Sequence, residues 1–277
     1  MNIVKKVKQK SWLLLFLISF FVFACENNTS ENGSNYVDEM TENASNSVIE
    51  TTENESDSDI EGEELQMTIG LQTPYIILPP PNTEGDMSVE SALANRRSRR
   101  NFRNRALSLE QLSQILWAAY GITSPMPNDL RGGLRTTPSA GALFPLEIYA
   151  IIGNVDGVES GVYRYNSTEH KLILITQGDV RSELSDAALN QRMVQEAPIS
   201  IFYSAVFERT TEIYGERGIT YVYMEIGHSA QNVYLQAEAL GLGTCAIGAF
   251  ADDRVRQILG LPDDEEPLYL MPIGYYY

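Results

Sequence analysis

The chain has 277 residues, with 37 acidic and 20 basic side chains and a formal net charge of −17. This balance argues against nucleic acid as a partner, because a phosphate backbone attracts clustered Lys and Arg. The only histidines are His170 and His228, and neither has a second ligand at helical spacing, so we expect no metal site.

The first 25 residues have the pattern of an export signal. Four lysines lie between residues 5 and 10, and residues 12–24 form an apolar run of thirteen, which is too short for a bilayer but suits a signal-peptide core. The run ends at Ala24-Cys25, which resembles the bacterial lipoprotein cleavage box. We therefore expect Cys25 to become a lipidated N-terminus that anchors the protein to a membrane of the bacterial cell envelope, outside the cytoplasm. The alternative is secretion with an unmodified Cys25 thiol.

Residues 26–64 contain thirteen acids, no Lys or Arg and almost no large apolar side chain. Such a segment buries too little surface to offset the entropy lost on ordering, so we expect a disordered tether. A calcium site is the other interpretation of the acids, but the Asp/Asn/Gly loop spacing is missing. The predicted organisation is a signal peptide at 1–24, a lipidated tether at 25–65 and one folded domain at 66–277. This domain keeps a charge of −8, because the tether carries −13 and the signal +4.

Local patterns place most elements of the folded domain. Ser88 caps a helix at 89–95, and Ser108 forms a capping box with Gln111 for a second helix that ends before Gly121. Residues 122–137 are predicted to form a loop. Further helices are expected at 179–189, from about 218 to 240, and between 252 and 260. An extended arm is expected at 76–78 and strands at 146–152, 161–165, 171–175, 198–206 and 268–273. Helices and strands mix without a regular βαβ repeat, which predicts an α+β fold.

The central helix and the residues after it are poor in charge. Glu238 is the only charged side chain between residues 231 and 246. A helix that is apolar on nearly all faces belongs in a core or a subunit interface, and Gly241 and Gly243 are expected to end it. The small residues at 244–250 would let backbone amides approach a flat ligand closely. On this stretch alone, a core helix with a glycine stop is the favoured interpretation.

Arg96, Arg97 and Arg100 lie within five residues, with Ser98 between them. Guanidinium forks and a hydroxyl are the donors that a phosphate monoester needs; the alternative is a solvated basic loop. Cys245 has no base near it in the sequence, and no G-x-S-x-G or P-loop motif is present. A phosphate site without hydrolytic machinery suits a bound cofactor that carries its own reactivity.

Four blocks occur in the order found in the FMN-dependent nitroreductase superfamily. The block ANRRSRRNF resembles the family's phosphate-binding start, and TTPSAGALFPLEIYAI resembles the segment that lies against the flavin ring. The block CAIGAF resembles the one whose backbone faces the ring, and LYLMPIGY resembles the last core strand. PSAGALFPLE and EIGHSAQNVYLQAEALGLGTCAIGAF resemble the SagB/ThcOx-type dehydrogenase branch. The resemblance covers about residues 76–277 and implies a nitroreductase-like fold, with a mixed or antiparallel central sheet and flanking helices around a buried central helix. It also implies a homodimer with two FMN sites at its interface.

The resemblance further implies roles for the residues that match the family's blocks. The FMN phosphate would be held by Arg96, Arg97, Ser98 and Arg100. One side of the flavin ring would be contacted, from the second subunit, by Pro138, Ser139, Ala140 and Ala142. The other side of the ring would be lined by Ala246, Ile247, Gly248 and Ala249.

Two departures from the family pattern bear on the reaction. Azoline-oxidising members carry Lys-Tyr-Gly before the central helix, where this chain has Ile213-Tyr214-Gly215, so the missing lysine argues against azoline oxidation. Tyr214 remains the candidate acid/base, with a core tyrosine as the alternative. Many nitroreductases also place a C-terminal basic pair on the phosphate. This chain ends in three tyrosines, so we expect its N-terminal arginines to carry that charge alone.

These inferences together predict a lipid-anchored FMN oxidoreductase that transfers hydride through flavin N5, with a small-molecule or peptide substrate. One alternative is a dehydrogenase that acts on a peptide or another secreted substrate. A second is a surface-binding module that kept the fold without turnover, and a purified protein without a flavin absorption band would favour it.

Replacing Cys25 with Ser is expected to release the protein from the membrane fraction with its signal uncleaved or miscleaved, because the acyl chains would have no thiol to modify. Cell fractionation with mass spectrometry of the N-terminus measures both effects. Wild-type protein that is wholly soluble and unacylated would contradict the lipid anchor.

Overall fold

A seven-stranded sheet in the order β1-β6-β5-β4-β7-β9-β8 forms the centre of the structure, and every strand pair in it is antiparallel. The structure is a computed structural model that describes residues 75–126 and 132–277. The sheet contains β1 (Tyr75–Ile77), β4 (Leu146–Ile152), β5 (Gly161–Asn166), β6 (Lys171–Gln177), β7 (Ile199–Ala205), β8 (Gly243–Thr244) and β9 (Glu266–Gly274). The predicted α+β fold around a central sheet is therefore confirmed, with an antiparallel sheet.

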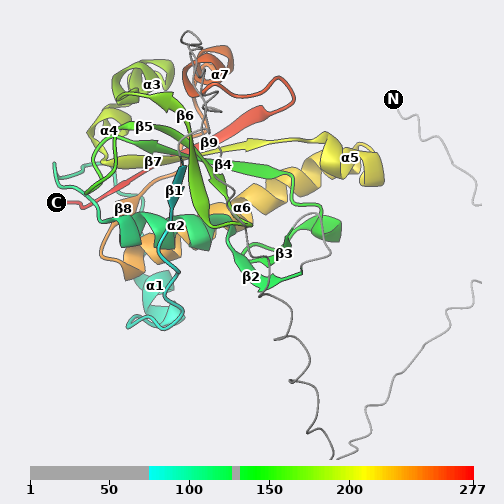
Figure 1. Cartoon of the computed structure of the whole chain (residues 1–277), viewed down its shortest axis with the longest axis horizontal. Helices are drawn as coiled ribbons and strands as arrows, with labels where there is room; N and C mark the ends of the chain where they lie inside the picture. Colours follow the sequence, from blue (N-terminus) through cyan, green and yellow to red (C-terminus); the bar gives the residue numbers. More distant parts are fainter. Residues whose placement is uncertain (1–74, 127–131) are drawn as a thin grey trace, which may run out of the picture. The chain divides into compact units, whose positions relative to one another are not determined.

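Helices cover both faces of this sheet (Figure 1). The helices are α1 (Val89–Asn95), α2 (Leu109–Tyr120), α3 (Arg181–Ala187), α4 (Arg192–Glu196), α5 (Glu208–Tyr214), α6 (Arg217–Ala239) and α7 (Asp252–Leu259). One core lies between the sheet and α2 and α6, and the other between the sheet and α3, α4 and α7. Strand β4 shows why: Ile148 faces the first core and Tyr149 the second, so both faces of the strand are apolar. No helix of the described residues is both long and apolar enough to cross a bilayer.

Elements with strong local signals lie where the sequence predicts them. Helix α1 begins after Ser88, whose side chain accepts from the Ser91 amide, and Ser108 and Gln111 complete the capping box of α2. The predicted hairpin is β5 and β6, and β4 has the predicted bounds. The predicted signal peptide, Cys25 and the tether lie outside the described residues.

Elements with weak local signals were predicted wrongly. The predicted loop at 122–137 contains a two-stranded sheet, β2 (Ile122–Pro125) and β3 (Gly133–Arg135). Its register shifts within β2 and Gly133 has a φ of 124°, so neither strand shows the alternation that identifies a strand. Helices α4 and α5 were missed because they are short and no side chain caps them. Helix α3 ends at Ala187, before the predicted 189, because Leu189 has a positive φ of 58°.

The long helix α6 buries one side in the core and exposes the other in the single chain, which fits either the core or the subunit interface that its apolar pattern predicts. Its inner side, with Val222, Ile226 and Val233, packs in the first core. On its outer side, Tyr223 is 56% and Met224 49% exposed. The helix ends as predicted, with Gly241 in the left-handed conformation at a φ of 69°.

A buried carboxyl on α6 connects this helix to α2. Glu225 is 3% exposed and accepts a short hydrogen bond from the Tyr120 hydroxyl. Burial raises the pKa of the Glu225 carboxyl above its ordinary value of 4.5, while hydrogen bonds from Ser139 and Tyr120 and the charge of Arg135 lower it. The net effect is a raised pKa, so the folded protein holds this proton to higher pH than the unfolded chain does.

This raised pKa predicts a pH dependence of stability. The stability that the protonated Glu225 contributes is complete below pH 4.5 and is lost as the pH rises through the folded-state pKa. The variant Glu225→Gln stays neutral, so its stability lacks this pH dependence. The melting temperature of the variant minus that of the wild type should therefore rise by a few degrees between pH 4 and pH 8, which corresponds to about 1 kcal/mol. Thermal unfolding followed by circular dichroism measures the difference. A difference that is constant or shrinks with rising pH would contradict the assignment.

Candidate functional site

The arginine-rich segment after α1 is tied to the end of α6 by the backbone. Ser98 forms an isolated bridge with Thr244 in β8, and the Arg99 amide donates to the Thr244 carbonyl oxygen at 2.9 Å. The Ser98 hydroxyl lies 3.1 Å from the Tyr234 hydroxyl of α6. The segment that follows the helix α1 is therefore held in place by β8 and by the last turns of α6.

The six arginines between residues 96 and 105 divide into two groups. Three of them stack on the tyrosines at the C-terminus: Arg99 on Tyr276 at 4.4 Å, Arg103 on Tyr277 at 5.3 Å and Arg105 on Tyr275 at 3.8 Å. The other three, Arg96, Arg97 and Arg100, form no ion pair with any described carboxylate. Arg96 lies over the ring of Tyr234, with 5.2 Å from its Cζ atom to the ring centroid. These three guanidiniums fit a phosphate, because they are cations without a carboxylate partner in an acidic chain.

The hydroxyl of Tyr234 joins the arginine-rich segment to residues 246–249. It accepts a hydrogen bond of 2.8 Å from the Ala246 amide and also lies 3.1 Å from Ser98 Oγ, where either hydroxyl can be the donor. Ile247 is buried against β9 by two backbone hydrogen bonds with Leu270, of 2.8 and 2.9 Å. Sequence reasoning placed Tyr234 on an apolar helix face and missed its role. The signal that could have pointed to it is a tyrosine, with a hydroxyl that needs a partner, on an otherwise apolar helix.

The residues after Ile247 are exposed to solvent, whereas the thiol of Cys245 before it is buried. Gly248 and Ala249 are exposed and Ala246 is half-buried. Cys245 is 1% exposed, and burial raises the pKa of its thiol although Arg100 opposes the rise. Exposed backbone next to the arginines suits close contact with a flat ligand, whereas the thiol is set up as an inert core residue.

The predicted ring-facing segment forms a strained turn before β4. Residues Gly141, Ala142 and Phe144 have positive φ values of 60°, 51° and 47°. The turn is held by Ser139, whose Oγ accepts from the Phe144 amide at 2.9 Å and whose hydroxyl is hydrogen-bonded to Glu225. Non-glycine residues at positive φ persist where the surroundings enforce them, which is common at ligand-binding sites. Pro138 is exposed at the start of this turn, and Ala140 and Ala142 are half-buried.

Tyr214 lies against this turn. A Cβ atom added to Gly141 would lie 2.8 Å from the Tyr214 hydroxyl, so the glycine is required for this approach. The Tyr214 side chain is 38% exposed and its ring packs against Tyr221 with the centroids 5.1 Å apart. The interpretation as a buried core tyrosine therefore does not hold, because the residue is partly exposed, with its hydroxyl beside the ring-facing segment.

The two parts of the predicted site lie on different sides of α6. Asn232 donates to the Thr136 carbonyl and to Thr137 Oγ1, both at 3.2 Å, and so fixes the approach to the ring-facing turn. Tyr234, which holds Ser98 and Ala246, is two residues further along the helix, a rotation of about 200°. The fold thus brings the arginine-rich segment together with residues 246–249, and it places residues 138–142 apart from them.

The two histidines have different surroundings. His170 is half-buried and its ring nitrogens lie 2.8 Å from Tyr165 Oη and 2.8 Å from Ser113 Oγ. Burial lowers the pKa of the His170 imidazole, while a hydrogen bond to Pro79 raises it. His228 is exposed on α6 in the single chain. The satisfied structural histidine is therefore His170.

Comparison with known proteins identifies the family of this chain. The model of the nitroreductase family matches residues 93–275. A Methanocaldococcus jannaschii protein named as a nitroreductase is 48% identical over 189 residues, which are 68% of this chain and 91% of that protein. A crystal structure described as a nitroreductase from Ralstonia eutropha superimposes with a TM-score of 0.62 at 31% identity, covering 73% of this chain and 90% of the other. The microcin B17-processing protein McbC of Escherichia coli is 26% identical over 160 residues, 56% of this chain and 57% of that protein. The chain therefore belongs to the nitroreductase family of flavin oxidoreductases.

Proposed function

We propose that this protein is an FMN-dependent oxidoreductase whose cofactor phosphate is held by Arg96, Arg97, Arg100 and Ser98. The observation that carries the proposal is that these arginines have no carboxylate partner among the described residues, while Tyr234 holds Ser98 with its hydroxyl and Arg96 over its ring. When bound, FMN supplies hydride transfer at its N5 atom. The contribution of the chain is to neutralise the phosphate, to donate the Ser98 proton to it, and to present open backbone at 246–249 to the ring.

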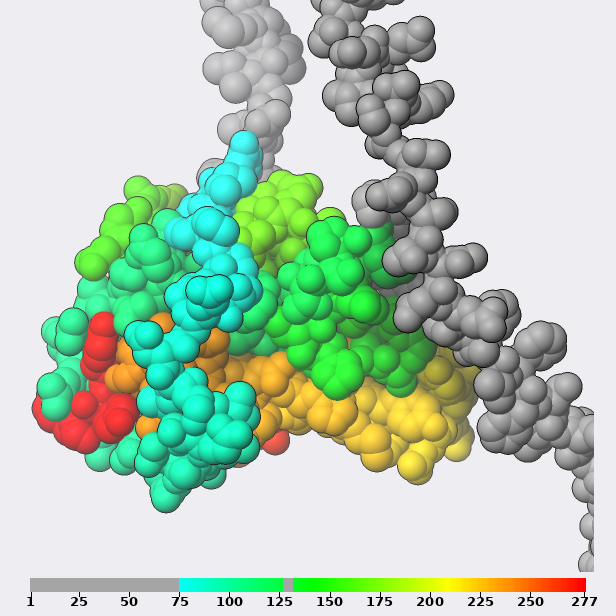
Figure 2. All heavy atoms as spheres, turned by 90° about the horizontal axis from the view of Figure 1, so that it is seen from below, coloured from blue at the N-terminus to red at the C-terminus, as the bar shows by residue number. Residues whose placement is uncertain are grey.

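We further propose that the working form is a homodimer. The support is that the arginine-rich segment and the ring-facing turn contact α6 on different sides, about 200° apart around the helix axis. Two segments on opposite sides of one helix do not reach the same flavin ring within a single chain. The outer side of α6 and the end of α5 also expose apolar residues, with Ile213 66%, Ile219 42% and Tyr223 56% exposed. Figure 2 shows α6, in yellow to orange, uncovered along this face of the molecule. A second copy that covers this face would bring its own ring-facing turn to the first copy's arginines.

Within this function, Tyr214 is the proposed proton donor. The residue is partly exposed and its hydroxyl adjoins Gly141 of the ring-facing turn. Ile213 occupies the position of the lysine of azoline-oxidising members, so a reaction that needs that lysine is not favoured. The substrate is proposed to be a small molecule or a peptide. The peptide alternative gains support from two relatives named for processing peptides, McbC and the trifolitoxin-processing protein TfxB of Rhizobium leguminosarum, the latter 28% identical over 46% of this chain and 35% of that protein.

The proposed location is the bacterial cell envelope, with Cys25 as a lipidated N-terminus. The basis is the apolar run at 12–24 and the acidic segment at 26–64, which suit an anchor and a tether for a domain that works outside the cytoplasm. Nicotinamide nucleotides are scarce there, so the electron donor is proposed to be a different reductant.

The double variant Arg96→Ala with Arg100→Ala is expected to lose FMN while keeping its fold. Each charge-assisted hydrogen bond to a phosphate contributes on the order of 1.5–3 kcal/mol, so the loss of two arginines weakens binding by roughly two to four orders of magnitude. The flavin-to-protein absorbance ratio after gel filtration measures the loss. Arg192→Ala with Arg254→Ala, which removes two exposed arginines elsewhere, is the matched control. A double variant that stays fully yellow would show that the segment is only a solvated loop.

The variant Tyr214→Phe is expected to keep its flavin and to turn over about a hundredfold more slowly, because general acid catalysis contributes rate without contributing cofactor affinity. The measurement is reoxidation of the chemically reduced protein by a nitroaromatic acceptor in stopped flow. Tyr221→Phe is the control, since Tyr221 packs on Tyr214 without adjoining Gly141. Equal rates for the wild type and Tyr214→Phe would exclude Tyr214 as the proton donor.

A further inference from the structure

A cavity of about 240 Å³ opens where the strands β4 and β5 separate. Their pairing runs from Ile152 opposite Gly161 to Tyr149 opposite Arg164 and stops there, although β4 begins three residues earlier at Leu146 and β5 continues to Asn166. The cavity occupies this gap in the sheet. None of the residues that we assign to FMN lines it, so it is a separate site.

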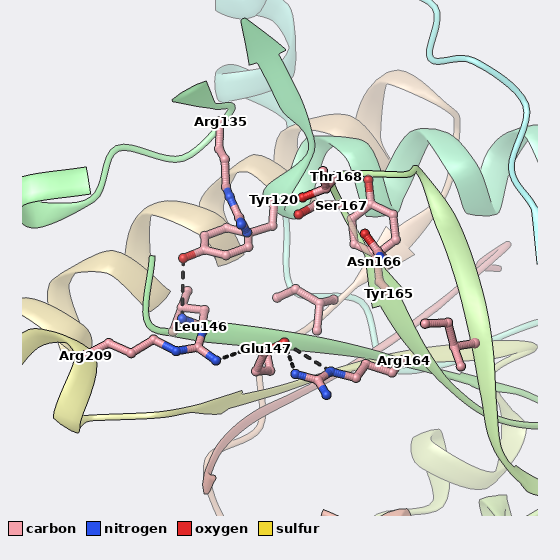
Figure 3. A pocket seen from close by; sticks show the side chains of 12 residues that line it. Tyr120, Arg135, Leu146, Glu147, Arg164, Tyr165, Asn166, Ser167, Thr168 and Arg209 are labelled. Carbon is pink, nitrogen blue, oxygen red and sulfur yellow. Dashed lines mark hydrogen bonds and ion pairs between the residues drawn. The ribbon is translucent and has the colours of Figure 1, made fainter. Parts of the chain in front are cut away.

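Two arginines and a carboxylate form one wall of the cavity (Figure 3). Arg164 reaches Glu147 Oε2 with its Nη2 at 2.8 Å and its Nε at 3.2 Å, and Arg209 donates to Glu147 Oε1 at 2.7 Å. Each oxygen of Glu147 is therefore held by a different guanidinium. Arg164 Nη2 also lies 3.7 Å from Oε1 of the buried Glu265, so the arginines of this wall already contact two carboxylates of the protein itself.

The two arginines also keep unused donors. A guanidinium has five N–H groups, and within the described contacts Arg164 Nη1 and Arg209 Nε have no hydrogen-bond partner. Their side chains are 37% and 40% exposed, whereas that of Glu147 is 14% exposed, so the cations are more accessible than the anion between them. Bidentate arginine recognises planar carboxylates particularly well.

The opposite wall is polar and uncharged apart from one further cation. In Figure 3, Ser167 and Thr168 from the turn between β5 and β6 lie across the cavity from Glu147, near Arg135. The Arg135 guanidinium is stacked on the Tyr120 ring at 4.3 Å. Hydroxyl groups opposite guanidiniums suit a ligand that is anionic at one end and hydrogen-bonding at the other, and the volume limits it to the size of a small metabolite.

We propose that this cavity is a binding site for a small organic carboxylate, with Arg164 and Arg209 as its cationic ligands and Glu147 as a built-in competitor for them. The site lies directly behind the ring-facing turn, since Arg209 also donates to the Phe144 carbonyl at 3.2 Å. A bound carboxylate would use the N–H groups that Glu147 leaves open. The proposal stands apart from the flavin assignment, because it involves different residues and a different ligand.

Isothermal titration calorimetry of the purified, flavin-loaded protein tests the ligand class. Succinate is expected to bind, the neutral analogue succinamide to give no heat of binding, and inorganic phosphate to bind more weakly than succinate. Equal binding of succinate and succinamide would overturn the proposal. Tighter binding of phosphate than of succinate would overturn the carboxylate assignment.

Variants test the residues, with opposite signs expected for the cations and the competitor. Arg209→Gln and Arg164→Gln should weaken succinate binding by about tenfold or more, because each removes charge-assisted hydrogen bonds. Glu147→Gln should strengthen it, since both guanidiniums then lose the carboxylate that competes with the ligand, although Arg164 keeps its contact with Glu265 and Arg209 its hydrogen bond to the Phe144 carbonyl. Arg192→Gln, which removes a 79% exposed arginine on α4, should leave the dissociation constant unchanged.

A purely structural role for the Glu147 cluster gives a different outcome. In that case Glu147→Gln would weaken binding together with the arginine variants or leave it unchanged, and either result would overturn the proposal. Circular dichroism and the flavin absorbance ratio show whether each variant keeps its fold and cofactor. If Arg164→Gln does not fold, Arg209→Gln and Glu147→Gln still test the proposal. We expect both to fold, because Arg209 is partly exposed and the Gln side chain has the shape of Glu.

Discussion

One tyrosine hydroxyl holds the proposed phosphate site together. The Tyr234 hydroxyl accepts a hydrogen bond from the Ala246 amide and lies within hydrogen-bond distance of the Ser98 hydroxyl. This one oxygen atom therefore connects segments that are almost 150 residues apart in the chain. The same ring supports the Arg96 guanidinium. Because Tyr234 stands on the long helix α6, the position of the phosphate donors depends on how α6 packs against the sheet. The site is thus rigid because its support belongs to the core.

Charge is distributed so that the cations near the site stay available. The chain is acidic overall, yet Arg96, Arg97 and Arg100 pair with no described carboxylate, and the neighbouring arginines stack on C-terminal tyrosines instead. A tyrosine ring orients a guanidinium without neutralising it. The C-terminal tyrosines therefore organise the positive segment while preserving its charge, where a row of acids would have cancelled it.

The helix α6 has a different task on each side. Its buried carboxyl, Glu225, reaches Ser139 and so steadies the strained turn before β4, while Tyr234 steadies the arginine-rich segment. The outer side of the helix exposes Tyr223 and Met224. The proposed dimer and the proposed flavin site are therefore linked through α6. A second subunit that covers the outer apolar side of this helix would also complete the flavin site.

The sequence by itself determined the elements whose signals are local. The Ser88 and Ser108 caps and the hairpin turn after Asn166 act within a few residues, so their positions follow from the residues there. It also determined the family, because the matching blocks are contiguous. Tertiary structure alone decided which groups meet. The pairing of β2 with β3, the contact of Tyr234 with Ser98, and the gap beside Arg164 all depend on segments distant in the chain, and no local propensity encodes them. The exposure of α6 was likewise undecidable from its pattern, since an apolar face looks the same whether a core or a second subunit covers it.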